Sequence, residues 1–261
     1  MALMRDIRSY EVPHGAAAVW WLGQSGYIFK SSGGLVIGLD LYLTNSVPEL
    51  LPNLPINAHR MQPVFLRPEE VDVDIFACTH SHFDHADPLT IRNLPKNDAV
   101  RFVAPYLTCL KMREYGVPGS QIVSLAVEQE IEFGDIKLRG AYAVPTDASD
   151  LNHLGYLLTF DDSVRIYVTG DTDHSELLGA MAKYAPHVLI ACINGNFNNL
   201  SHWEAAELAK WIEPKIAIPC HYDMFPDNAM DPAQFRASLK IRAPRVQYRE
   251  LPHAQVEIFR F

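Results

Sequence analysis

Directly after a short apolar run, this sequence gathers histidine and aspartate side chains at a density that packing does not explain. Residues 73–78 predict a buried β-strand, and His80, His82, Asp84 and His85 follow it. Buried imidazoles need polar partners, so three histidines and a carboxylate within six residues favour a binding role. Two histidines two residues apart point to one side of an extended segment, and a turn through the second pair directs it elsewhere. The pattern predicts two adjacent metal positions at a strand end.

Short apolar runs alternate with helical patterns along the rest of the chain. Strands are predicted at 17–22, 27–30, 35–40, 74–78, 136–143, 156–160, 165–169, 188–193, 216–219 and 256–261. Helices are predicted at 106–115, 175–184, 202–212 and 232–240. Ser201 and Glu204 form a capping box before the third helix, and the proline-punctuated residues 48–68 indicate a long surface loop. The alternation predicts a layered α/β sandwich.

The composition excludes several classes of protein. Hydrophobic residues make up 48% of the 261 residues and charged residues 20%, which is typical of a globular protein rather than a disordered or fibrous one. There are 22 Lys and Arg against 31 Asp and Glu, a net charge of −9, without a dense basic run. This balance argues against nucleic acid or an anionic membrane as a partner. With no signal-like apolar segment near Met1, we expect a cytoplasmic protein that acts on a small molecule.

The His-x-His-x-Asp-His pattern resembles that of the metallo-β-lactamase superfamily, whose members are mostly metal-dependent hydrolases built as a four-layer αββα sandwich. The resemblance implies that residues 1–261 form one such domain of two similar halves, with ligands from loops of both halves. By this resemblance Asp171, in a Gly-Asp-Thr motif after the predicted strand 165–169, bridges two metals. His221, at the end of another predicted strand, matches the last ligand position.

The resemblance also implies a third ligand for the first metal, in the loop before the strand that leads to the Gly-Asp motif. Asp147 is better placed within that loop and is preferred. His153 has the more usual chemistry but lies directly against the next strand, so it stays as a ligand or as a hydrogen-bond donor to one. A carboxylate here would shift the preference of the site from zinc towards manganese or iron.

Within the superfamily, the sequence is similar to the branch of L-ascorbate-6-phosphate lactonase-like (UlaG-type) proteins. The similar segments are 19–26, 30–34, 115–118, 219–223 and 231–232, together with Asp40. That branch carries an aspartate where Asp147 lies, and it resembles a manganese-using lactonase. The full lactonase is longer, and its phosphate-binding residues do not map onto this chain. The branch also implies a homo-oligomer.

The combined motifs predict a hydrolase with two divalent ions, manganese or zinc, with iron as an alternative. Such a pair lowers the pKa of a shared water from about 16 to near 7. Asp84 and Asp171 are the predicted catalytic carboxylates, and Asp84 would orient the hydroxide. Asp40 is either a partner of a ligand histidine or a plain turn residue.

The substrate is predicted with less detail. A small polar molecule is expected, either a lactone or a phosphorylated sugar derivative. The predicted substrate contacts are Gln24, Asn196, Asn198 and Tyr222. An asparagine-rich turn explains residues 194–199 equally well. The alternatives are a metal-dependent phosphodiesterase, an iron-binding redox protein of the same fold, and a metal-binding protein without activity, which would show a broken ligand set.

Overall fold

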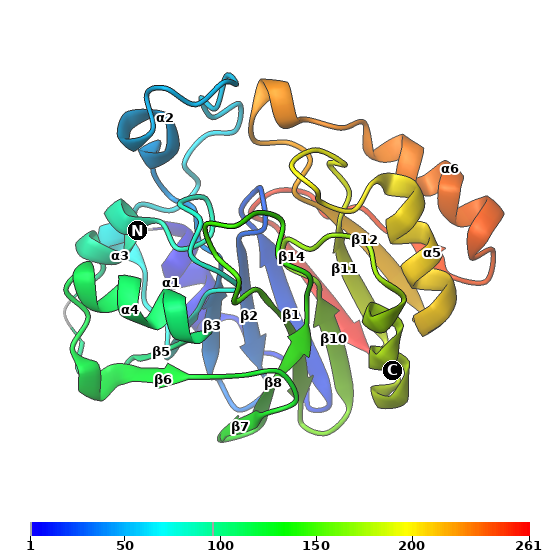
Figure 1. The fold of residues 1–261 in the computed structure, drawn as a ribbon. Helices are drawn as coiled ribbons and strands as arrows, with labels where there is room; N and C mark the ends of the chain where they lie inside the picture. The colour runs from blue at the N-terminus through cyan, green and yellow to red at the C-terminus, as the bar shows by residue number, and fades with distance from the viewer. Residues whose placement is uncertain (1, 96) are drawn as a thin grey trace.

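The computed structural model describes residues 2–95 and 97–261, and its centre is a pair of seven-stranded β-sheets (Figure 1). The first sheet contains, in spatial order, β14 (Val256–Arg260), β1 (Ala16–Trp21), β2 (Tyr27–Ser31), β3 (Val36–Leu39), β4 (Ile75–Ala77), β5 (Arg101–Ala104) and β6 (Ile122–Ser124). The second contains β13 (Gln247–Tyr248), β12 (Ile216–Cys220), β11 (Val188–Cys192), β10 (Val164–Val168), β9 (Leu154–Phe160), β8 (Ile136–Tyr142) and β7 (Glu130–Phe133).

Helices cover the outer face of each sheet (Figure 1). The first sheet is covered by α1 (Ala2–Ser9), α3 (Pro88–Asn93) and α4 (Tyr106–Glu114). The second is covered by the 3-10 segment η3 (Glu176–Tyr184), α5 (His202–Ile212) and α6 (Pro232–Arg242). The remaining elements are α2 (Ser46–Leu50) and the 3-10 turns η1 (Pro68–Glu70), η2 (Gly119–Gln121) and η4 (Pro226–Asn228). No described helix is long and apolar enough to span a bilayer.

Alternating side chains of β1 explain why a run of six apolar residues lies inside. Val19 and Trp21 point between the two sheets and pack with residues of β8 to β12. Ala18 and Trp20 point the other way and belong to a second buried cluster, which includes Met4 and Ile7 of α1. Successive residues of a strand face opposite sides, so a strand covered on both faces is apolar throughout. The result is the four-layer sandwich that the resemblance implied, which confirms the predicted fold class.

The strand directions bring the predicted site residues to one end of the sandwich. β3, β4, β5 and β6 are parallel to one another, as are β10, β11, β12 and β13. The loops after the parallel strands therefore leave each sheet at a common edge. Two hydrogen bonds join the sheets there: Leu154 N–H donates to Thr79 O at 2.9 Å, and Tyr156 Oη donates to Cys78 O at 2.8 Å.

All ten predicted strands and four predicted helical segments are present, with small shifts at their ends. The segment expected to be a helix at 175–184 is 3-10 rather than α. Residues 48–68 contain the end of α2 and otherwise run without regular structure to η1. The capping box of Ser201 and Glu204 is confirmed. The last strand, β14, pairs with β1 and completes the sheet that the first half of the chain begins.

Candidate metal centre

The loop after β4 holds the histidine cluster in a fixed turn. Its backbone closes through His85 N–H, which donates to His82 O at 3.0 Å. Ser81 N–H donates to the carboxylate of Asp150 at 2.8 Å, and that carboxylate is fully buried. Asp150 lies in the loop between β8 and β9. Its carboxylate therefore connects the loop that carries His80 and His82 to the loop that carries His153.

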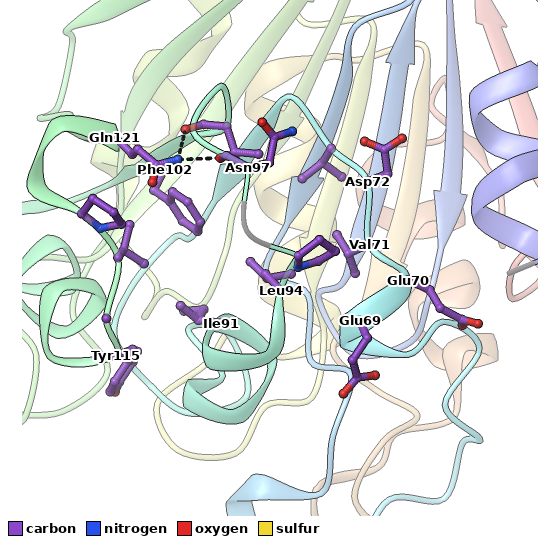
Figure 2. Close-up of a pocket in the computed structure, with 16 residues that line it drawn as sticks. Glu69, Glu70, Val71, Asp72, Ile91, Leu94, Asn97, Phe102, Tyr115 and Gln121 are labelled. Atoms are coloured by element: carbon purple, nitrogen blue, oxygen red, sulfur yellow. Dashed lines mark hydrogen bonds between the residues drawn. The ribbon is translucent and has the colours of Figure 1, made fainter.

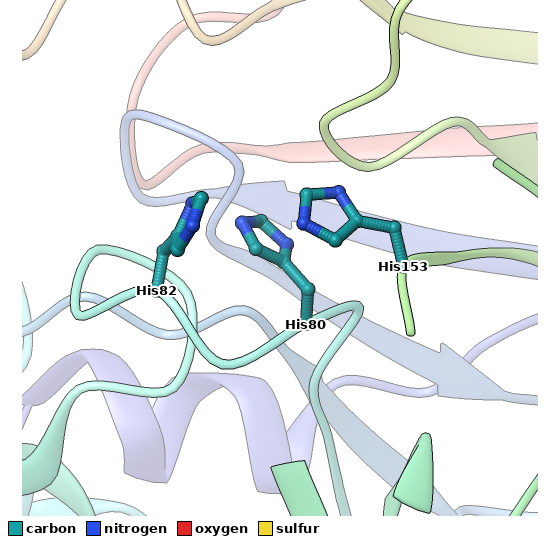
Figure 3. Close-up of side chains that lie close together, drawn as sticks. All are labelled: His80, His82 and His153. Atoms are coloured by element: carbon teal, nitrogen blue, oxygen red, sulfur yellow. The ribbon is translucent and has the colours of Figure 1, made fainter. Parts of the chain in front are cut away.

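One group of donors consists of His80, His82 and His153, whose rings face one another (Figure 3). A ring nitrogen from each lies within 4.8 Å of the others. His153 Nδ1 lies 3.0 Å from the carbonyl oxygen of Asp171, and because a carbonyl only accepts, Nδ1 carries the proton. His80 Nδ1 lies 3.0 Å from Thr79 Oγ1. These contacts leave Nε2 of both rings as the available nitrogen.

A second group consists of Asp84, His85 and His221. Asp171 lies against this group and also belongs to a set with His80 and His85. Its Oδ1 is 3.2 Å from His85 Nε2, and its Oδ2 is 3.3 Å from His221 Nε2. One carboxylate therefore contacts the second group and lies within 4.8 Å of His80 in the first, which is the position that the resemblance predicts for a bridging ligand.

Asp40 orients one of these histidines. Its Oδ2 accepts hydrogen bonds from His85 Nδ1 at 2.8 Å and from Thr79 Oγ1 at 2.7 Å, and its Oδ1 accepts from Thr79 N–H at 2.7 Å. The carboxylate has no solvent exposure. A carboxylate on the second nitrogen of an imidazole is the usual support of a metal-binding histidine. Of the two roles left open for Asp40, the structure supports this one.

The electrostatics of the two groups differ. Burial lowers the pKa of His80 well below its ordinary value, and it also lowers the pKa of His153. Burial opposes the charged form of His221 as well, but the carboxylates of Asp171 and Asp84 together outweigh it and raise the pKa of His221 to about 9. Together with Asp40, the same carboxylates raise the pKa of His85 well above the ordinary value against the effect of burial. His80 and His153 are thus neutral imidazoles, whereas the second group balances carboxylates with positive charge.

Of the two candidates for the third ligand, the structure places His153 rather than Asp147 among the donor groups. β9 begins at Leu154, whose backbone N–H donates to Thr79 O. This bond holds His153, the residue before Leu154, beside His80. The Asp147 side chain is 52% exposed, and none of the described donor groups includes it. Its Oδ2 lies 3.3 Å from His82 Nε2, which makes it a neighbour of the group rather than a member.

The predicted substrate contacts fall into different places. Gln24 Nε2 lies 2.7 Å from Asp84 Oδ2 and 2.9 Å from His221 Nε2, so Gln24 does reach the centre. Tyr222 is buried against Trp21, with ring centroids 5.3 Å apart.

Neither predicted asparagine contacts the donor groups. Asn196 and Asn198 are exposed, and their side-chain amides donate to backbone oxygens of Asp227 and Thr146. The neighbouring Asn199 was missed, although its Nδ2 donates to Asp171 Oδ2 at 2.7 Å. The sequence carries no signal that separates these three amides, since the backbone turn at Phe197 and Asn198 decides which one points inward.

The donor atoms themselves suit a cation. Nε2 of His80 and Nε2 of His153 are buried and make no hydrogen bond within the described residues. An unpartnered buried polar group costs about 1–3 kcal/mol. Divalent transition metals are bound by this combination of imidazole nitrogens and carboxylate oxygens. The residues present therefore fit metal ions.

Two cavities bear on the location of the site. One of about 500 Å³ is lined by His82, Asp84, Asp171 and His221, so it opens onto the donor groups. Another of about 290 Å³ lies near α3 and α4, between residues such as Leu94, Phe102 and Tyr115 (Figure 2). Its wall is braced by Gln121 Nε2, which donates to Asn97 O at 2.8 Å. The first cavity is the one that a substrate of the metal centre would occupy.

Comparison with known proteins identifies the family. A family model for the beta-lactamase superfamily domain matches residues 18–221. This chain belongs to the beta-lactamase superfamily. Superfamily relatives include a UPF0173 metal-dependent hydrolase of Archaeoglobus fulgidus, 27% identical over 247 residues that cover 88% of this chain and 93% of that protein. A probable L-ascorbate-6-phosphate lactonase UlaG of Salmonella gallinarum is 22% identical, covering 94% of this chain and 80% of that protein.

A solved structure shows the same fold. Igni18, a metallo hydrolase from Ignicoccus hospitalis, superposes with a TM-score of 0.74 at 19% identity, covering 94% of this chain and 99% of that chain. The resemblance predicted from the motifs, to the superfamily and to its lactonase-like branch, is confirmed. The relatives also support the coarser part of the functional prediction, a metal-dependent hydrolase of this superfamily.

Proposed function

We propose that this protein is a hydrolase that uses two divalent metal ions to cleave a carboxylic ester bond, with lactones as the leading substrate class. The observation that carries the proposal is the position of Asp171, whose two oxygens face His85 and His221 while His80 and His153 present unpartnered nitrogens nearby. When bound, two such ions activate water as a nucleophile and polarise the substrate carbonyl.

The residues divide into two sets of ligands in this proposal. His80, His82 and His153 would hold one ion, and Asp84, His85 and His221 would hold the other, with Asp171 lying between the two sets. A nitrogen-rich first set favours zinc or iron, whereas the carboxylates of the second set also suit manganese. The sequence favoured Asp147 as the third ligand of the first ion, and a carboxylate there would have shifted the preference from zinc towards manganese or iron. With His153 in that place, this argument for manganese no longer applies.

Two amides next to the ligands orient them. Asn199 donates to Asp171 Oδ2 at 2.7 Å, which fixes the rotation of the shared carboxylate. Gln24 donates to Asp84 Oδ2 at 2.7 Å. Asp84 Oδ2 is thereby placed to accept a hydrogen bond from the attacking water and to orient it towards the cavity.

The test combines metal analysis with a substrate panel. Protein loaded with zinc or manganese is expected to bind two ions per chain and to hydrolyse simple lactones or esters. His82→Ala is expected to lower kcat/KM by more than the roughly 100-fold that loss of a ligand's hydrogen-bond partner costs. The matched control is His14→Ala, since the His14 side chain is 93% exposed and contacts Asp161. Cleavage of a phosphodiester without any ester cleavage would replace the proposal with phosphodiesterase activity.

A further inference from the structure

The cavity beside the metal centre is lined by both polar and apolar side chains. Metal-binding residues line it together with the polar side chains of Ser81, Thr146, Ser149, Asn199 and Asn228. The rest of the lining, called here the apolar wall, consists of side chains from α2, the segment that follows it and three loops: Val47, Leu51, Leu54, Ile56, Phe83, Phe197 and Phe225. A volume of about 500 Å³ is within the range of about 300–1,000 Å³ that is usual for small-molecule sites.

The apolar wall is a built structure with its own packing. Val47 and Phe225 belong to a small buried cluster that is separate from the two main cores, and Leu54, Ile56 and Phe83 pack against it. Hydrogen bonds from backbone N–H groups fix the segment that follows α2 to the second half of the chain. Met61 N–H donates to Met224 O at 2.8 Å, and Asn57 N–H donates to Asp227 Oδ2 at 2.7 Å.

The rim of the cavity leaves apolar surface without a partner. Leu51 is 40% exposed and Phe197 is 50% exposed, and both line the cavity. Exposed apolar surface that lines a concave site is a mark of ligand binding rather than of ordinary solvent contact. A ligand that covers these two side chains gains the free energy of removing them from water.

The charges around the cavity disfavour a phosphate. Among the described lining residues, Lys111 is the only lysine or arginine, and its Nζ lies 3.0 Å from Glu114 Oε2. Three carboxylates line the same space: Asp84, Asp147 and Asp171. Phosphate recognition uses arginine forks, unpaired lysines or the N-termini of helices. The lining offers a phosphate one lysine that is already paired, against the negative charge of Asp147.

We propose that the group next to the scissile bond of the substrate is uncharged and apolar, an alkyl or aryl substituent that lies against Phe197, Leu51 and Phe83, and that it is not phosphorylated. This inference rests on the proposed function, because it assumes that the reacting bond lies at the metal centre. Of the two substrate classes predicted from the sequence, a lactone or a phosphorylated sugar derivative, the inference favours a lactone without a phosphate.

The first experiment measures kcat/KM of the zinc-loaded and manganese-loaded protein on γ-lactones that carry a linear alkyl chain of increasing length. Each methylene buried against the wall is expected to raise kcat/KM about fourfold. Phe197→Ala is expected to reduce this gain per methylene. Leu177→Ala is the matched control, since Leu177 is 62% exposed on η3 and does not line the cavity. A lactone with a phosphorylated substituent that reacts faster than its alkyl counterpart would overturn the inference and leave the hydrolase proposal intact.

A second experiment separates binding from catalysis. Alkylhydroxamates chelate divalent metals, so their binding to the metal-loaded protein by calorimetry requires no turnover. The affinity is expected to rise with the length of the alkyl chain, and to rise less in Phe197→Ala. This result supports the apolar pocket even if the protein cleaves no ester. In that case only the proposed reaction is wrong. Affinity that does not change between acetohydroxamate and octanohydroxamate overturns the pocket assignment.

Discussion

Substitution of Asp40 by Asn should weaken metal binding, because it changes the hydrogen bonding of one proposed ligand, His85. Asp40 is fully buried and accepts three hydrogen bonds, two of them at Oδ2 from Thr79 Oγ1 and His85 Nδ1. An asparagine keeps one acceptor for Thr79 N–H but turns an NH2 donor towards His85. His85 can then accept at Nδ1 only if its proton moves to Nε2, the nitrogen that faces Asp171. The proton would occupy the position that a metal needs.

The size of the effect follows from this geometry. Loss of a carboxylate partner of a metal-binding histidine costs about 10- to 100-fold in metal affinity, or about 1.4–2.8 kcal/mol. Loss of a hydrogen bond to a charged group costs the metal-free protein about 1.5–3 kcal/mol of unfolding free energy. The backbone adds nothing to this, because Asp40 has φ of 48° and asparagine tolerates that region as aspartate does.

The assay is a competition titration of zinc against a chromophoric chelator, paired with urea unfolding of the metal-free protein. Asp87→Asn is the matched control. Asp87 is also fully buried and accepts from Leu89 N–H and two threonine hydroxyls, but it contacts none of the proposed ligands. Both variants should lose stability, whereas Asp40→Asn alone should lose zinc affinity. Equal zinc affinity in wild type and Asp40→Asn, or an equal loss in both variants, would refute the reasoning.

Three further expectations concern the third ligand, a glycine and a titrating histidine. His153→Ala should lower the metal content by one ion per chain, while Asp147→Ala retains both ions, as counted by elemental analysis; the reverse pattern would restore Asp147 as the ligand. Gly155→Ala should cost about 1–3 kcal/mol in urea unfolding, because an added Cβ would lie 2.8 Å from Val168 O and 2.9 Å from Thr169 O; an unchanged midpoint would contradict this. Burial lowers the pKa of His187 to about 4, so the unfolded chain binds this proton first and stability falls as pH drops from about 6.5 towards 4. His187→Asn should shrink the difference in unfolding free energy between pH 7 and pH 5, and an unaltered difference would exclude His187 as its source.

The sequence predicted best those ligands that lie close together in one loop or directly after a strand. The predicted ligands of one loop, His80 to His85, are separated by few residues, so the turn that arranges them is short. Asp171 and His221 each follow a buried parallel strand, and the ends of such strands can be predicted from apolar runs. The fold followed from the same runs together with the family resemblance. Elements without a clear period were missed, among them β7, whose side chains alternate between exposed and partly buried positions at a sheet edge.

The residues that could not be predicted are those placed by contacts between distant loops. Proximity to a strand counted against His153 in the sequence, yet the strand is what holds it beside His80. Asn199 and Asp150 act through residues 28 and 69 positions away, and nothing local marks them. Leu51, Leu54 and Ile56 of the apolar wall lie in a segment whose prolines indicated a surface loop without showing which side chains line a cavity.

The pairing of β14 with β1 has a consequence for how the chain is made. About 235 residues separate these neighbours, so at roughly 5–20 residues per second the ribosome needs on the order of ten to fifty seconds to supply the partner of β1. Throughout that interval Ala16–Trp21 has an open, wholly apolar edge, the kind of surface that joins other nascent chains. Protection of this edge during synthesis, by a chaperone or by slow release, should therefore govern the yield of the folded protein.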